Sequence, residues 1–111
     1  MILRVIVFRA AEFGFTDVAL PVLLKFTKDL GYFDIKVDHA SLTMRFFGEE
    51  RLSEFYRVKK RVEDLSALPE FEGSRVAVAE GEFENWTDEL RVVSAAVLSS
   101  QTSNKAQEPT R

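Results

Sequence analysis

The sequence predicts one α+β domain of four strands and two helices, followed by a third helix and a tail. Three observations lead to this fold class. Apolar residues alternate with other residues in four short segments, which is the period of a strand. Between them, two longer segments carry apolar residues at helical spacing. The chain has 111 residues, enough for one domain, and its 46% hydrophobic and 30% charged residues are typical of a globular protein.

The order of these segments decides the topology. The predicted elements follow one another in the order strand, helix, strand, strand, helix, strand, and no internal repeat is visible. The predicted elements are a strand over residues 2–9, a helix over 17–30, strands over 33–37 and 42–47, a helix over 49–66, a strand over 75–79 and a helix starting at 86.

The first helix has recognisable ends. Thr16 can accept a hydrogen bond as N-cap, and Asp17 places a carboxylate in the first turn, where the helix dipole favours it. Pro21 is tolerated only in or near the first turn, so the helix is expected to begin later than Thr16. Gly31 suits the left-handed position that follows a helix.

The second helix carries the clearest apolar stripe in the chain, formed by Leu52, Phe55, Val58, Val62 and Leu65. A loop with a buried aromatic residue, Phe71, follows it. The last strand is expected to continue to Glu84 by way of a β-bulge near Gly81.

This order predicts a ferredoxin-like βαββαβ two-layer sandwich, with two helices on one face of a four-stranded antiparallel sheet. The domain is expected to span residues 1–98. Residues 99–111 contain no large apolar residue and are expected to form a disordered tail.

The second face of the sheet raises the functional question. We expect Arg4, Ile6 and Phe8 of the first strand to lie on this outward face, beside Arg45 and Phe47 of the third strand. Such an apolar patch can be covered by the C-terminal helix, by a second copy of the chain, or by nucleic acid that stacks on the aromatic rings.

Charge is unevenly distributed along the chain. Residues 51–61 carry a net charge of +4, and residues 63–89 carry −8. The basic block predicts a basic helix patch at Arg57, Lys60 and Arg61. An isoelectric point near 5.2 opposes phosphate binding, and the basic-Gly-aromatic run of RNA-recognition domains is absent.

The residues that commonly carry catalysis do not cluster in this sequence. There is no cysteine and one histidine, His39, which falls in a predicted turn. Glu80, Glu82 and Glu84 alternate along one strand, where charged residues protect a sheet edge more often than they bind metal. We therefore predict no catalytic residue, no metal and no cofactor.

These observations favour a small non-catalytic interaction or regulatory module that self-associates, as a homodimer, through the open sheet face or a sheet edge. The alternative is an RNA- or DNA-binding module that uses Phe8, Phe47, Arg4 and Arg45, and a small enzyme is the third hypothesis. No signal peptide or transmembrane run is visible, so we expect a cytoplasmic protein. Residues 1–98 contain no glutamine or cysteine and a single asparagine, a composition typical of thermophiles.

Overall fold

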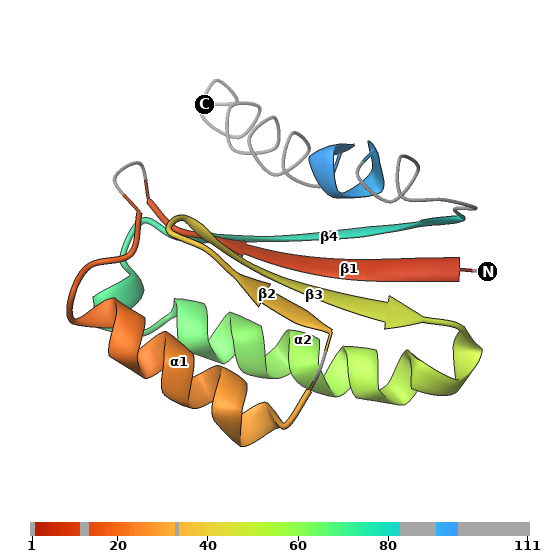
Figure 1. The fold of residues 1–111 in the computed structure, drawn as a ribbon, viewed down its shortest axis with the longest axis horizontal. Helices are drawn as coiled ribbons and strands as arrows, with labels where there is room; N and C mark the ends of the chain where they lie inside the picture. The colour runs from red at the N-terminus through yellow and green to blue at the C-terminus, as the bar shows by residue number, and fades with distance from the viewer. Residues whose placement is uncertain (1, 12–13, 33, 83–90, 96–111) are drawn as a thin grey trace, which may run out of the picture.

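The computed structural model of the protein describes residues 2–11, 14–32, 34–82 and 91–95 (Figure 1). These residues form an α+β fold with a four-stranded antiparallel sheet and two α-helices that lie on one side of it. The strands are β1 (Ile2–Arg9), β2 (Ile35–Val37), β3 (Ser41–Phe47) and β4 (Arg75–Glu82). The helices are α1 (Ala19–Leu30) and α2 (Leu52–Ser66), with short 3-10 turns η1 (Glu49–Arg51) and η2 (Pro69–Phe71).

The sheet has the order β2-β3-β1-β4, so β1 and β3 are central and β2 and β4 form the edges. β1 pairs with β3 from Leu3↔Phe47 to Arg9↔Ser41, and with β4 along its whole length. The β1–β4 register is continuous, so the bulge expected near Gly81 is absent, and β4 continues to Glu82 without it. Residues 83 and 84 lie outside the described part of the chain.

The helix layer encloses the larger core. α1 contributes Leu23 and Phe26. Four of the five residues of the predicted α2 stripe are buried, which confirms the orientation of this helix: Phe55, Val58, Val62 and Leu65. Phe71 is also buried, as predicted for the loop after α2. The sheet contributes Ile6, Phe8, Leu42, Met44 and Phe46 to this core.

The opposite face of the sheet carries a second, smaller core of Leu3, Val5, Val7 and Ala77. Residues 91–95 are helical, and Val92 and Val93 pack against this second core. Figure 1 places this segment on the side of the sheet away from α1 and α2. The chain's own C-terminal segment therefore covers part of the face that the sequence left open.

Local hydrogen bonds explain the ends of α1. The Thr16 hydroxyl accepts a hydrogen bond from the Ala19 backbone N–H at 3.0 Å, and the helix begins at Ala19, which leaves Pro21 in the first turn. Gly31 ends the helix in the left-handed conformation, with φ 61°. Gly14, at φ +85°, also requires glycine, because a Cβ there would lie 2.5 Å from Nε2 of His39.

Several predictions fall on residues outside the described ranges, namely the tail at 99–111, the end of the domain at 96–98 and the start of the last helix at 86–90. Among the helices that the structure describes, none has the length and apolar character needed to cross a membrane.

Candidate interaction surfaces

The expected outward patch does not form as predicted, because β1 faces the other way. Ile6 and Phe8 are fully buried under α1 and α2 and belong to the helix-side core. Ile6 is paired with Met44 of β3, and Phe8 is paired with Leu42. Paired residues lie on the same face of a sheet, so Ile6 and Phe8 face the helices as Met44 and Leu42 do. The placement of Ile6 and Phe8 on the outward face was therefore wrong. Both faces of β1 are apolar, so the residue pattern of this strand does not show which face the helices cover.

Arg45 and Phe47 do lie on the outward face. Phe47 packs against the second core, and Cζ of Arg45 lies 6.0 Å from the centroid of the Phe47 ring. The structure therefore brings Arg45 and Phe47 together and separates them from Ile6 and Phe8. Their new neighbours across β1 are Val5 and Leu3.

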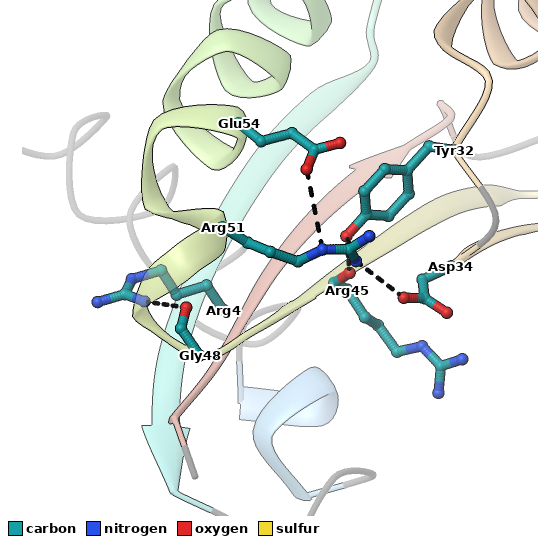
Figure 2. A network of polar contacts seen from close by, with 7 residues as sticks. All are labelled: Arg4, Tyr32, Asp34, Arg45, Gly48, Arg51 and Glu54. Atoms are coloured by element: carbon teal, nitrogen blue, oxygen red, sulfur yellow. Dashed lines mark hydrogen bonds and ion pairs between the residues drawn. The ribbon is translucent and has the colours of Figure 1, made fainter.

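Arg4 lies on the helix side and is 7% exposed. Its Nε lies 2.7 Å from Oε2 of Glu80 and its Nη2 lies 3.5 Å from Oε1 of Glu49. Nη1 donates to the Gly48 carbonyl oxygen at 3.4 Å (Figure 2). Because its charge is compensated by groups from β4 and η1, we assign Arg4 to the stability of the fold rather than to a binding surface.

A polar network that the sequence analysis missed joins the C-terminal end of α1 to β3 and α2 (Figure 2). The Tyr32 hydroxyl donates to the Arg45 carbonyl oxygen and accepts a hydrogen bond from Arg51. Nη1 of Arg51 also lies 3.0 Å from Oδ2 of Asp34, and its Nε lies 3.8 Å from Oε2 of Glu54. Its guanidinium stacks on the tyrosine, with Cζ 4.5 Å from the ring centroid. No spacing motif links these residues in the sequence.

Burial raises the pKa of Tyr32 to about 12, above its ordinary value of 10.0, and the nearby Arg51 charge only partly opposes this shift. The folded protein therefore holds this proton more tightly than the unfolded chain does. The corresponding stability is complete below pH 10 and is lost as the pH rises through 12.

We expect the free energy of unfolding of wild type to fall by about 1–2 kcal/mol more than that of Tyr32→Phe between pH 9 and pH 11.5. A rise of the Tyr32 pKa from 10.0 to about 12 corresponds to about 2.7 kcal/mol, and the solvent that reaches this side chain reduces that value. Urea unfolding of both proteins at the two pH values measures the difference. Identical pH dependence of the two proteins would show that Tyr32 titrates equally in the folded and unfolded states.

The predicted basic helix patch is only partly a free surface. Arg57 is exposed on α2, whereas Nζ of Lys60 lies 3.5 Å from Oδ1 of Asp64. The guanidinium of Arg61 lies over the Phe26 ring, with Cζ 5.3 Å from its centroid. Arg61 thus serves the contact between the two helices, and Arg57 and Lys60 remain on the outside of α2.

A small hollow of about 50 Å³ lies where β1 ends and β4 begins. The acidic residues Glu70 and Glu72 line it, together with Ser74, whose buried hydroxyl makes no hydrogen bond within the described ranges. A hollow of this size holds one or two water molecules.

His39 is exposed in the turn before β3, as predicted. Within the part of the chain that the structure describes, no three His, Asp or Glu side chains are grouped to hold a metal ion.

β4 is the longer of the two edge strands of the sheet. β4 has eight residues, whereas the other edge strand, β2, has three. Val78, near the middle of β4, is 40% exposed.

No protein-family model, no curated protein and no solved structure matches this chain.

Proposed function

We propose that this protein is a small non-catalytic interaction module that self-associates as a homodimer through the outer edge of β4. One observation carries the proposal. β4 pairs with β1 along all eight of its residues, and no other strand of the described part of the chain pairs with its outer side. Backbone N–H and C=O groups along such an edge can pair with a second strand.

The sequence of β4 also favours pairing. Natural edge strands are often protected by charged side chains, proline or a bulge, and β4 has neither proline nor a bulge. Its described charges stand at its ends: Arg75 at the first residue, and Glu80 and Glu82 at the other end. The four residues between Arg75 and Glu80 form an uncharged centre that contains the exposed Val78.

Charge also selects the register of a symmetric pair. Opposite residues of an antiparallel pair share one face of the sheet, so the two-fold axis must pass through a single residue position. An axis at Val78 sets the two Val78 side chains opposite each other and places Glu80 opposite Val76 of the second copy. An axis at Ala79 would instead bring the two Glu80 carboxylates into diagonal contact, which is unfavourable. We therefore propose the register centred on Val78.

We also propose that the domain is a variant of the ferredoxin-like fold. The succession β1, α1, β2, β3, α2, β4 and the central position of β1 and β3 support this assignment. In this fold the β4 edge is distant from the β2–β3 hairpin, so dimerisation through β4 leaves that hairpin accessible.

Replacing Val78 with lysine tests the proposed edge. Wild type should have twice the 12.7 kDa chain mass by light scattering, and Val78→Lys should have the mass of one chain, because two opposed ammonium groups at the centre repel each other. Leu24→Lys is the matched control, because Leu24 is 52% exposed on α1 and its replacement also changes an apolar side chain into a cationic one. It should remain a dimer.

Two results would contradict the proposal. One is a wild-type mass of 12.7 kDa throughout a concentration series. The other is a dimer that persists in Val78→Lys but dissociates in Leu24→Lys, which would place the contact on α1 instead of β4. Circular dichroism of each variant confirms that the compared chains are folded.

A further inference from the structure

The position of α2 above the sheet determines what a pair of β4 strands brings together. α2 contacts both β1 and β4, so its axis lies above the boundary between these two strands. Neighbouring strands are about 4.8 Å apart, so pairing β4 with β4 of a second copy sets the two α2 axes about 10 Å apart. Packed helices have axes about 8–10 Å apart. A sheet that continues across two copies therefore brings their α2 helices within contact range.

One side of α2 faces α1 and β2 of the same copy. The guanidinium of Arg61 lies over the Phe26 ring of α1. Glu54 stands two helical turns before Arg61, so it lies on the same side of α2. Its Oε2 lies 3.8 Å from Nε of Arg51, which also contacts Asp34 just before β2. The opposite side of α2 therefore faces away from α1, above the outer edge of β4.

The side of α2 above β4 carries four residues at helical spacing, and we call them the α2 flank: Leu52, Tyr56, Lys59 and Glu63. Tyr56 is 60% exposed, although most of its ring is apolar. Leu52 is the one residue of the predicted apolar stripe that is only half-buried. Nζ of Lys59 lies 3.0 Å from Oε2 of Glu63, so these two charges compensate each other. The α2 flank is therefore a neutral surface with exposed apolar area.

Val78 extends this neutral surface onto the sheet. Val78 is paired with Ile6, which is buried under the helices, so the side chain of Val78 lies on the helix side of β4. Its exposed fraction of 40% means that α2 leaves part of β4 uncovered beside the α2 flank. In the register centred on Val78, the two valines of a dimer form the floor between the two α2 helices. The exposed Tyr56 rings are the large side chains available to cover that floor.

We infer that the two α2 helices of the homodimer pack antiparallel against each other through the α2 flank, with Tyr56 of each copy against α2 of the other. This inference rests on the proposed pairing of β4. The occupant of the flank is a second copy, because the two-fold axis that pairs β4 with itself also relates one flank to the other. Strand pairing supplies mainly backbone hydrogen bonds, and the helix contact adds the aromatic and apolar centre that is typical of a stable interface.

Single cysteines test the distance between the two helices. The chain has no cysteine, so one introduced cysteine forms a disulfide only with the same residue of another copy. With axes about 10 Å apart and a Cα radius of about 2.3 Å, facing Cα atoms lie about 5.4 Å apart, within the range of about 4.4–6.8 Å that a disulfide spans. We expect oxidised glutathione to link at least one of Tyr56→Cys, Lys59→Cys and Glu63→Cys into a covalent dimer on a non-reducing gel. Arg57→Cys and Asp64→Cys, on the exposed side of α2 away from the flank, are the controls and should stay unlinked.

Truncation of the tyrosine measures its share of the dimer affinity. Tyr56→Ala should raise the dissociation constant of the dimer at least about tenfold, because buried tyrosines are among the residues that contribute most to interfaces. Arg57→Ala is the matched control, since it removes a long exposed side chain from the same turn of α2 and should leave the dissociation constant unchanged. Sedimentation over a concentration series gives both constants. Circular dichroism checks that Tyr56→Ala is folded, as expected for a residue that is exposed within one copy.

The outcomes separate this inference from the pairing of β4. A monomeric wild type, or a dimer that persists in Val78→Lys, contradicts the pairing of β4 and with it the helix contact. If wild type dimerises and Val78→Lys does not, the pairing of β4 stands. The helix contact alone is then overturned if no cysteine of the α2 flank links and Tyr56→Ala keeps the wild-type dissociation constant. Equal linking of the flank and control cysteines would also overturn it, because random collisions produce that result.

Discussion

Replacing Phe8 with alanine should lower the free energy of unfolding by about 3–5 kcal/mol. Phe8 is fully buried, and its ring centroid lies 5.2 Å from that of Phe71 and 5.8 Å from that of Phe15. Alanine would remove these aromatic contacts and leave a cavity between β1, η2 and the segment before α1. A loss of this size is a large part of the stability of a small domain. Urea unfolding followed by circular dichroism measures it.

Phe47→Ala is the matched control for Phe8→Ala. Phe47 is also a phenylalanine of a central strand, but it is half-buried on the opposite face of the sheet. Its replacement should cost about 1–2 kcal/mol, because less apolar area returns to water. Equal losses at the two positions would contradict the assignment of Phe8 to the helix-side core.

Introducing charge at the C-terminal segment should destabilise the protein nearly as much. Val92 and Val93 pack against the second core, and Cγ2 of Val92 lies 3.4 Å from the position that a Cβ would take at Gly81. The double variant Val92→Asp with Val93→Asp should lose about 2–4 kcal/mol, because two carboxylates cannot be buried against an apolar sheet without partners. The segment should then detach, and the dye ANS should bind the uncovered face.

Ser94→Asp with Ala95→Asp provides the control for this experiment. Both residues are exposed on the same helical segment, so the change adds the same charge to the same turn. We expect stability within about 0.5 kcal/mol of wild type and no increase in ANS fluorescence. If the two double variants melt at the same temperature, residues 91–95 do not hold the second core closed.

Most elements of the fold could be predicted from the sequence because each satisfies a local rule. The stripe of α2 repeats every three or four residues and faces one core, so Phe55, Val58 and Val62 were assigned correctly. Gly31 ends α1 because only a residue without Cβ adopts its left-handed conformation at little cost. Phe71 could be predicted as buried because it is the one large aromatic residue of a polar loop.

The faces of the sheet were harder to predict, and the two central strands show why. In β3, Leu42, Met44 and Phe46 alternate with residues that are polar except for Phe47, so its buried side can be read directly. β1 is apolar at both parities, because α1 and α2 cover one of its faces and residues 91–95 cover the other. The apolar residues of β1 therefore indicate a central strand but do not show which of its faces lies under the helices.

The sequence by itself determined the number, order and inward helix faces of the elements, because these depend on neighbours a few residues away. Only the tertiary structure decided which residues meet across the sheet. The opposition of Arg9 and Arg75, 66 positions apart, follows from the β1–β4 register. The contacts of Arg51, in η1, with Tyr32 and Asp34 follow from the packing of η1 beside β3. Both depend on backbone pairing and packing over long separations, for which no local spacing rule exists.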